Sequence, residues 1–324
     1  PITPQQPHPL FNTAATRRME QRAAAGLPPH TLMQRAGLAV ARLAQALAPH
    51  ARTVWIACGP GNNGGDGLEA AMHLQREGRR VVVTWLGTPE YAPADARQSW
   101  QRALAAGVTW ADEAPPDMTA ADLCIDALLG IGISSAAATR EPDHRLLALL
   151  AALQHNPAPV LAVDLPSGLD GDTGQFAAGF ALHTPPALHR PLAPRHTLSL
   201  LTLKPGLFTA AGRDAAGNVW LDDLGVSAQQ EPPSAWLAGP ALPAPRRHAS
   251  HKGSYGDVAV VGGEGLAARG MGMTGAALLA ASAALHAGAG RVLVALLDDD
   301  QMAIDMAQPE LMFRRFDALA LEQL

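Results

Sequence analysis

The sequence predicts an α/β protein with a Rossmann-like, doubly wound and mostly parallel sheet. Three observations lead to this fold class. Short, continuous apolar runs, such as residues 53–58 and 159–163, alternate with stretches that carry helical spacing. Most of these runs end in a loop rich in Gly or Asp, and no internal repeat is visible. Apolar runs without alternation are typical of strands buried on both faces, as in parallel sheets covered by helices.

The individual elements follow from periodicity and from capping residues. Asn12 and Thr31 are plausible N-caps for the first two helices, and Gly78 ends the third. The expected helices cover residues 12–25, 31–47, 67–77, 94–106 and 143–154. The expected strands cover residues 53–58, 80–85, 122–125, 159–163, 197–203, 218–221 and 257–261.

Two breaks in this rhythm define the domain organisation. Residues 173–194 are rich in Pro, His and Ala, which predicts a long loop. Residues 228–245 are rich in Pro and predict a linker between a first domain, 1–227, and a second unit, 246–324. A helix and two strands after the linker are too few to close a large core of their own.

Composition excludes several classes of protein. Of the 324 residues, 48% are hydrophobic and 16% are charged, so the chain can bury a sizeable core. The net charge of −5 argues against a nucleic-acid partner, because there is no cationic excess to neutralise phosphates. The apolar run 273–297 holds His286, Arg291 and several glycines, which favours a helix and turn over a membrane span.

The two cysteines, Cys58 and Cys124, each lie in or at the end of a predicted buried strand. Two such residues do not make a disulfide framework, so both are expected to be free thiols in a reducing compartment. No leader sequence is visible at the start. We therefore expect a cytoplasmic protein.

The first candidate site is the segment 59–67, Gly-Pro-Gly-Asn-Asn-Gly-Gly-Asp-Gly, between a strand and a helix. Its glycines fit a dinucleotide-binding turn, in which backbone amides approach a phosphate. However, the acidic residue that normally follows about 20 positions later is missing. The side-chain oxygens of Asn62, Asn63 and Asp66 suit a ribose, a cation or a polar ring. A plain Gly-rich turn is the alternative.

Two further motifs place acidic residues at strand ends. Asp126 follows the apolar run 123–125, and Asp164 follows the run 160–163 and precedes Pro166, Ser167 and Gly168. The carboxyl ends of parallel strands border the crevice where ligands bind. Asp164 could serve as a general acid or base and Ser167 as a ligand oxygen, and turn capping is the alternative for each. Lys204, after the strand 197–203, could contact phosphate or take part in catalysis, or be a solvated charge.

Taken in order, these motifs resemble the NAD(P)H-hydrate epimerase family, the N-terminal half of the bifunctional NAD(P)H-hydrate repair enzymes. The resemblance covers roughly residues 10–226, and its specific parts are Asn-Asn-Gly-Gly-Asp-Gly at 62–67 and Asp-Leu-Pro-Ser-Gly-Leu-Asp at 164–170. The segment 32–37, Leu-Met-Gln-Arg-Ala-Gly, also looks like the family's second helix. The resemblance to this family implies an enzyme that interconverts the R and S hydrates of NADH or NADPH and holds a potassium ion.

Carried over by motif, the resemblance assigns roles to individual residues. It implies that Asp164 is the acid/base and that Lys204 belongs to the catalytic group. The potassium ion would contact Asn63, Asp126 and Ser167. The implied substrate contacts are Asn62, Asn63, Gly64, Gly65, Asp66, Gly130, Ile131, Gly132, Ile133, Ser134 and Asp164.

This sequence departs from the family pattern at two places. Ile131 stands where the family usually has Thr, which removes one hydroxyl from the expected nucleotide contact. The segment 177–195 is longer than the family's, and Arg195 stands where Asp is frequent.

The second unit resembles the beginning of the family's ribokinase-like, ADP-dependent dehydratase domain. The motifs are His-Lys-Gly-Ser-Tyr-Gly at 251–256 and Gly-Met-Thr-Gly-Ala at 272–276. The later Gly-Thr-Gly-Asp motif of that domain is not in the 324 residues. We therefore expect a dehydratase half that is only begun, with ADP or ATP as its ligand only if complete. A short tail packed on the first domain is the alternative.

The function expected from the sequence is the epimerisation of hydrated NADH and NADPH by a homo-oligomer. The alternative is a nucleotide-binding scaffold on the same fold that has no catalytic activity, as some relatives with this fold are. The presence of Asn63, Asp126, Asp164 and Ser167 favours the enzyme. An ordinary NAD-dependent oxidoreductase is disfavoured by the missing ribose-binding acid.

Overall fold

The structure is a computed structural model that describes residues 1–132, 143–180, 193–228, 231–240, 246–265, 270–297 and 302–315. The chain divides into two compact units, Pro1–Ala241 and Leu242–Leu324. The first unit is built on a seven-stranded sheet in the order β4-β3-β2-β5-β6-β7-β8, in which every neighbouring pair is parallel. The expected parallel, doubly wound sheet is therefore confirmed.

The helices of the first unit are α1 (Thr13–Ala25), α2 (Thr31–Leu47), α3 (Asn62–Arg76), α4 (Ala94–Ala105), α5 (His144–His155) and α6 (Gly212–Ala216), with the 3-10 turn η1 (Pro205–Leu207). The sheet strands are β2 (Thr53–Cys58), β3 (Arg80–Trp85), β4 (Thr109–Trp110), β5 (Leu123–Ala127), β6 (Val160–Val163), β7 (Arg195–Leu200) and β8 (Asn218–Asp222). A separate antiparallel pair joins β1 (His8–Leu10) to β9 (Ala235–Leu237).

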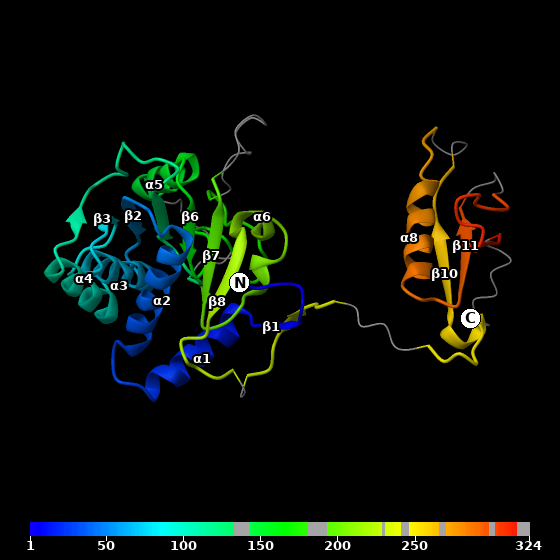
Figure 1. Ribbon diagram of the computed structural model, residues 1–324, viewed down its shortest axis with the longest axis horizontal. Helices are drawn as coiled ribbons and strands as arrows, with labels where there is room; N and C mark the ends of the chain where they lie inside the picture. Colours follow the sequence, from blue (N-terminus) through cyan, green and yellow to red (C-terminus); the bar gives the residue numbers. More distant parts are fainter. Residues whose placement is uncertain are drawn as a thin grey trace. The chain divides into compact units, whose positions relative to one another are not determined.

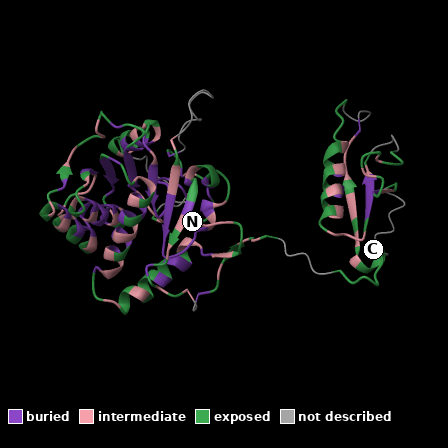
Figure 2. Cartoon of the chain, viewed as in Figure 1, coloured by how far each residue is buried: buried purple, intermediate pink, exposed green. Residues whose placement is uncertain are grey.

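Two apolar cores cover the two faces of the sheet (Figures 1 and 2). Alternate residues of one strand divide between them, so Ile56 packs with helices α1 to α4, and Trp55 packs with α5. Cys58 and Cys124 are both buried and free, as expected. Burial raises the pKa of both thiols, that of Cys124 to about 12, so neither is a ready nucleophile.

The strand order reverses between β2 and β5. The strands β3 and β4 extend the sheet on one side of this pair, and β6, β7 and β8 extend it on the other. Such a switch point separates the loops that follow the two central strands and leaves a crevice at their carboxyl ends. The loops that begin at Gly59 and Leu128 meet there. A Cβ on Gly59 would lie 1.8 Å from the carbonyl oxygen of Leu128.

Two expected boundaries differ clearly from the structure, and one expected N-cap is wrong. Helix α3 begins at Asn62 rather than Gly67, so the expected loop is its first turn. Thr31 is the first residue of α2, and its N-cap is His30, which makes no capping hydrogen bond. Strand β7 ends at Leu200, and Lys204 lies beyond a turn. In contrast, Asn12 caps α1 by accepting a hydrogen bond from the Ala15 amide at 2.8 Å.

The stretch expected to be a linker, 228–245, contains strand β9, which pairs with β1 in the first unit. Glu231 in the same stretch forms ion pairs with Arg18 and Arg22 of α1. The boundary between the two compact units falls after Ala241. Only part of the Pro-rich stretch therefore separates the units.

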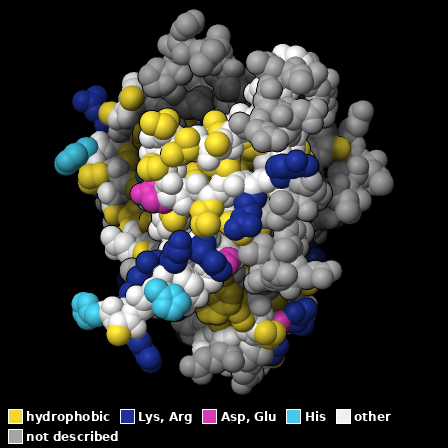
Figure 3. All heavy atoms as spheres, turned by 90° about the vertical axis from the view of Figure 1, so that its right-hand side faces the viewer, with side chains coloured by type: hydrophobic (Ala, Val, Ile, Leu, Met, Phe, Trp, Pro, Cys, Tyr) yellow, Lys and Arg dark blue, Asp and Glu magenta, His cyan; other side chains and the backbone are white. Residues whose placement is uncertain are grey.

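The second unit contains a three-stranded parallel sheet, β10-β11-β12, and one described long helix. Its elements are η2 (Lys252–Tyr255), β10 (Asp257–Gly262), α8 (Thr274–His286), β11 (Arg291–Leu296) and β12 (Met312–Phe313). Leu279 of α8 is 74% exposed, and Met306 is 85% exposed. Figure 3 shows hydrophobic side chains at the surface among Lys, Arg and His side chains. In the described part of the chain, no helix is long and apolar enough to cross a membrane.

Candidate active site

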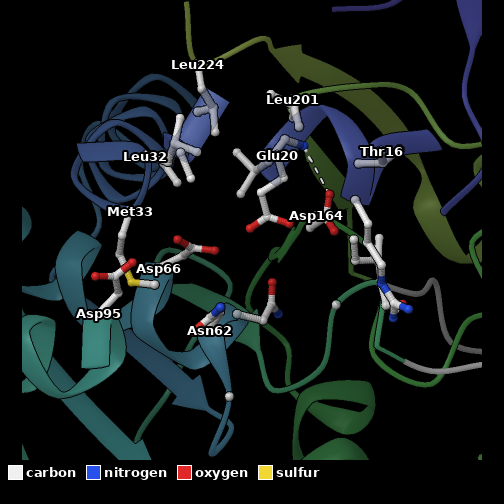
Figure 4. Close-up of a pocket in the computed structure, with 18 of the residues that line it drawn as sticks. Thr16, Glu20, Leu32, Met33, Asn62, Asp66, Asp95, Asp164, Leu201 and Leu224 are labelled. Atoms are coloured by element: carbon white, nitrogen blue, oxygen red, sulfur yellow. Dashed lines mark hydrogen bonds between the residues drawn. The ribbon is translucent and has the colours of Figure 1, made fainter. Parts of the chain in front are cut away.

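A pocket of about 600 Å³ opens at the switch point of the large sheet (Figure 4). This volume is in the range of small-molecule sites. Its walls come from α1, the start of α2 and the loop before it, the first turns of α3 and α4, and the segments after β2, β5, β6, β7 and β8. The polar lining residues are Thr16, Arg17, Glu20, His30, Thr31, Asn62, Asn63, Asp66, Asp95, Asp164 and Lys204.

Asp164 follows β6 in a left-handed backbone conformation, with φ at 68°. Its amide donates to the carbonyl oxygen of Leu198 at 2.8 Å, which fixes the turn. Both protein donors to its carboxylate, Lys204 Nζ and the Leu200 amide, bond to the same oxygen, Oδ1. Oδ2 has no hydrogen bond to any described residue. Asp164 lines the pocket, so one oxygen is anchored and the other is available to a ligand.

Lys204 is fully buried, which is unusual for a lysine. Besides Asp164, its ammonium donates to the carbonyl oxygen of Leu200 at 2.7 Å and to Ser199 Oγ at 3.4 Å. An ammonium has three donors, and these three acceptors account for all of them. Lys204 is therefore placed to hold Asp164 and has no donor left for a ligand.

A second acidic group lies behind the loop that follows β5. Asp126 Oδ1 accepts from Ser167 Oγ at 2.6 Å and from the Leu128 amide at 3.2 Å, and Oδ2 accepts from the Ser167 amide at 3.0 Å. Ser167 Oγ also accepts from the Leu129 amide at 2.8 Å. Burial raises the pKa of Asp126, and the hydrogen bonds from Ser167 oppose that shift. No described residue forms an ion pair with this carboxylate, but the positive charge of the partly buried Arg195 also lowers its pKa.

Asn63 lies in the first turn of α3, next to the loop that holds Gly130. Its Nδ2 is buried without a hydrogen-bond partner among the described residues. Its Oδ1 lies 3.0 Å from where a Cβ on Gly130 would be. A side chain at position 130 would require the Asn63 amide to move by a few tenths of an ångström, so the two groups are closely packed.

Carboxyl groups dominate the inner part of the pocket. Figure 4 shows the side chains of Glu20, Asp66 and Asp164 turned toward the same space. Loss of water raises the pKa of Asp66 well above its usual value, and repulsion from Asp164 adds to the shift. The same two causes raise the pKa of Glu20. Asp66 and Glu20 therefore hold protons more readily than ordinary surface acids.

An ionic cluster lies behind the pocket wall at His30. Glu69 of α3 is fully buried and forms an ion pair with Arg102 of α4 at 2.8 Å. The ring nitrogens of His30 lie 3.4 Å from Glu69 Oε2 and 3.7 Å from Asp95 Oδ1. Since Glu69 and Arg102 neutralise each other, this cluster ties α3 to α4 beneath the site.

Backbone strain is concentrated at the same pocket. Four of its lining residues have a positive φ although none is glycine: His30, Asp164, Leu201 and Leu224, with φ between 55° and 68°. Each such residue costs about 1–3 kcal/mol unless its surroundings compensate. The wall of this pocket is therefore stabilised by the rest of the fold.

The expected site residues fall into four groups, of which Gly64 and Gly65 are the last. Asn62, Asn63, Asp66, Gly130, Ile131, Gly132, Asp164 and Lys204 line the pocket. Asp126 and Ser167 lie together behind it and are not in the lining. Ile133 and Ser134 lie outside the described residues.

Gly64 and Gly65 were expected to contact the substrate, but they are buried and are absent from the pocket lining. A Cβ on Gly64 would lie 1.9 Å from the carbonyl oxygen of Gly59, and one on Gly65 would lie 2.5 Å from Met33 Sδ. The reason for glycine at these two positions is the close packing of α3 against its own entry loop and against α2.

Sequence reasoning missed the contribution of α1. Thr16, Arg17, Glu20 and Ala24 line the pocket from this helix. Thr16 Oγ1 and Thr202 Oγ1 lie 2.7 Å apart, and Arg17 Nη2 donates to the Ile131 carbonyl oxygen at 3.0 Å. The available signal was the i, i+4 spacing of Thr16 and Glu20, which puts two polar residues on one helical face.

The fold and this pocket define a Rossmann-like α/β protein with an acidic site at the switch point of its sheet. A family description, YjeF-related protein N-terminus, matches residues 29–206, more than half of the 324 residues. The chain belongs to this family.

Three curated relatives match most of the chain, and all are described as bifunctional NAD(P)H-hydrate repair enzyme Nnr. The protein of Escherichia coli K12 is 33% identical over 94% of this chain and 57% of its own length. The protein of Vibrio cholerae is 36% identical over 94% of this chain and 59% of its own length. The protein of Pyrobaculum aerophilum is 32% identical over 91% of this chain and 58% of its own length. The chain thus spans less than two thirds of these relatives.

A solved structure described as yeast ynu0, YNL200c, aligns with 64% of this chain and 86% of that chain. Its sequence identity is 20%, and its TM-score is 0.48.

Proposed function

We propose that the first unit interconverts the R and S forms of hydrated NADH and NADPH. The observation that carries this proposal is the carboxylate of Asp164 in the pocket lining. Its Oδ1 is anchored by two donors, and its Oδ2 has no hydrogen bond to a described residue. Family membership and the names of the relatives support the same substrate. The pocket offers other carboxyl groups but no second anchored carboxylate of this kind in its described lining.

The chemistry needs one movable proton at a fixed place. The hydrate carries a hydroxyl on the ring carbon beside nitrogen, and this carbon is the stereocentre. In one route, Asp164 Oδ2 takes the hydroxyl proton as the carbon–nitrogen bond opens to a carbonyl, and the ring nitrogen gains a proton. Closure on the other face of the carbonyl reverses these transfers and gives the other epimer.

In the second route, protonated Asp164 gives its proton to the hydroxyl, which leaves as water. The ring is then a cation stabilised by its nitrogen, and water adds to the other face and returns the proton. Glu20 and Asp66 surround this ring with carboxyl groups of raised pKa. In either route, Lys204 acts through Asp164, because it fixes Oδ1 and thereby aims Oδ2.

We also propose that Asn63, Asp126 and Ser167 hold a potassium ion. Their oxygen donors are of the kind that hard cations prefer. The carboxylate of Asp126 is buried and forms no ion pair with a described residue, although the charge of Arg195 acts on it. When bound, the ion would neutralise Asp126 and fix the loops after β5 and β6 relative to α3.

The dehydratase activity of the relatives remains a proposal for this chain, which spans 57–59% of the E. coli and V. cholerae proteins. ADP or ATP would bind the second unit only where the dehydratase half is complete. A cytoplasmic location is supported by two free, buried cysteines. A homo-oligomer is supported by exposed Tyr91 and Trp236, 91% and 60% accessible, and light scattering after size-exclusion chromatography tests it.

The decisive experiment is the epimerisation rate on purified R-hydrate of NADH, coupled to a separate S-specific dehydratase, with and without potassium. Conversion well above the uncatalysed rate supports the proposal. Binding of the hydrate without conversion would replace it with a nucleotide-binding scaffold. If the hydrate does not bind, this reading of the pocket is wrong.

A further inference from the structure

The charges around the pocket do not suit a dinucleotide unless one group is assigned to its phosphates. The lining holds four acidic side chains, Glu20, Asp66, Asp95 and Asp164. A hydrated dinucleotide brings a diphosphate with two negative charges of its own. Like charges at short distance repel, so a cation that faces the diphosphate would favour binding.

The described lining holds three groups that can carry positive charge, and two of them lie against carboxylates of the protein. Lys204 uses its donors on Asp164, Leu200 and Ser199. The ring of His30 is buried, and its two nitrogens lie within ion-pair distance of Glu69 and Asp95. Lys204 therefore has no donor left for a phosphate. The ring nitrogens of His30 make no hydrogen bond to a described residue, but the two carboxylates beside the ring would repel a phosphate.

Arg17 is the third group, and it is exposed on α1 at the pocket. A guanidinium has five N–H donors. Among the described residues, Arg17 uses Nη2 for the carbonyl oxygen of Ile131 and forms no ion pair with any carboxylate. Four of the five N–H donors remain, and Nη2 keeps a second hydrogen. One of the two forks, Nε with Nη2 or Nη1 with Nη2, is therefore still able to bind two phosphate oxygens at once.

The position of Arg17 also fixes which end of the substrate lies where. Glu20 stands three residues further along α1, about 4.5 Å along the helix axis. Its carboxyl group faces Asp66 and Asp164, where the hydrated ring would react (Figure 4). Arg17 instead contacts the loop 130–132 through the Ile131 carbonyl oxygen, away from the carboxyl groups that would face the reacting ring.

We propose that Arg17 binds the diphosphate of the hydrated dinucleotide, with the reduced ring inward at Asp164 and the adenosine end beyond the loop 130–132. This assignment rests on the proposed function for its substrate. Through its bond to the Ile131 carbonyl, the same guanidinium holds the loop in place for the phosphates. Arg17 is therefore a specificity residue for dinucleotides over single nucleosides.

The test compares Arg17→Gln, Arg17→Lys and a matched control, Arg42→Gln. Arg42 is an exposed arginine of α2 that is not in the pocket lining, so its loss changes net charge equally. With hydrated NADH, we expect KM to rise about 10- to 100-fold in Arg17→Gln, as for a lost charge-assisted hydrogen bond, with kcat within about twofold. The KM of Arg17→Lys should lie between those of Arg17→Gln and the unaltered protein. The KM of Arg42→Gln should match that of the unaltered protein.

A second substrate isolates the diphosphate. The hydrate of reduced nicotinamide riboside carries no phosphate, so its KM should be the same in the unaltered protein and Arg17→Gln. An equal rise in KM for both substrates, or no rise for hydrated NADH, would overturn the assignment while leaving the epimerase intact.

If the unaltered protein shows no turnover, the proposed function fails and binding decides the role of Arg17 separately. Titration calorimetry with ADP-ribose, which keeps the diphosphate, should then show weaker binding to Arg17→Gln than to Arg42→Gln. Equal affinities, or no binding to any of the proteins, would reject the diphosphate site.

Discussion

The buried ammonium of Lys204 is hydrogen-bonded to Oδ1 of Asp164, and both residues follow strands that are neighbours in the sheet. The Leu200 amide bonds to the same carboxylate oxygen, and the Leu200 carbonyl accepts from the same ammonium. One short turn after β7 therefore fixes both the position of the carboxylate and its charge partner. A reactive carboxylate is held more firmly in this way than by a surface ion pair.

Asp164→Asn should lower kcat for epimerisation about 100- to 10,000-fold, because the amide keeps the acceptor for Lys204 but cannot carry the proton. Hydrate binding should persist, since the side chain keeps its shape. Steady-state rates and equilibrium binding of hydrated NADH measure the two effects. Asp117→Asn, a 65% exposed carboxylate, is the control. Turnover unchanged in Asp164→Asn would remove Asp164 from the acid/base role.

Lys204→Met should destabilise the first unit by about 3–5 kcal/mol, because it leaves a buried carboxylate without its partner. Urea unfolding monitored by circular dichroism gives the free energy of unfolding. The double variant Lys204→Met with Asp164→Asn should recover part of the loss, because no unpaired charge is then buried. No recovery in the double variant would show that packing of the lysine stem, not charge pairing, is what Lys204 contributes.

Ser167→Ala should weaken the effect of potassium on both activity and thermal stability. The hydroxyl bonds to Asp126 and to the Leu129 amide, so its loss removes one proposed ligand and loosens another. We expect the potassium concentration for half-maximal effect to rise about tenfold. Ser99→Ala, at a fully buried serine of α4, is the matched control. A potassium response identical in both variants would place the ion elsewhere.

Asp66→Asn should stabilise the protein more at pH 8 than at pH 5. Burial and Asp164 raise the pKa of Asp66, so the folded state binds this proton more tightly than the unfolded state. The contribution of Asp66 to stability is full below its ordinary pKa and is lost as pH rises through the raised value. Melting temperatures of the variant and the unaltered protein at the two pH values measure the gain in stability. The control is Asp112→Asn, at a carboxylate that is 99% exposed. The same gain at both pH values would contradict the raised pKa.

Gly37→Ala should separate α2 from α3 and lower stability by about 1–3 kcal/mol. The added Cβ would lie 2.4 Å from the Cβ of Glu69 and 2.9 Å from the Ala70 amide nitrogen, so backbone must move. Since Glu69 carries the ion pair with Arg102, the shift would reach the pocket wall at His30. The control is Gly275→Ala in α8, where nothing lies within 4 Å of the new methyl group. Equal stability of the two variants would contradict the tight packing.

The parallel sheet was predictable because its strands are continuous apolar runs whose residues alternate between two buried cores. The motif residues were predictable because acidic residues recur at the carboxyl ends of several strands of one parallel sheet, where ligands bind. The start of α3 was not predictable from local preference, since the glycines at 64, 65 and 67 disfavour a helix. They are required by contacts with Gly59, Met33 and Ala127, which only the folded chain brings near.

The contribution of α1 to the pocket was missed for a related reason. Its amphipathic pattern identifies a helix, but nothing local shows that Thr16 meets Thr202 or that Arg17 meets Ile131. Strand β9 was missed because its pairing with β1 joins residues more than two hundred positions apart. Propensity cannot report such contacts, and the Pro-rich composition of that stretch favours a linker.

The pocket draws its walls from residues as far apart in the chain as Thr16 and Leu224, and four of them hold backbone conformations that only the surrounding structure maintains. No single hairpin or helix pair contains enough of the lining residues to bind a ligand alone. The sheet must pair across its whole width before Asp164, Lys204 and Asp66 come together, and loss of any central strand disperses them. Binding competence is thus an all-or-none property of the first unit: a partly unfolded chain has no partial site, and a ligand that fills the pocket opposes every large-scale opening of the sheet.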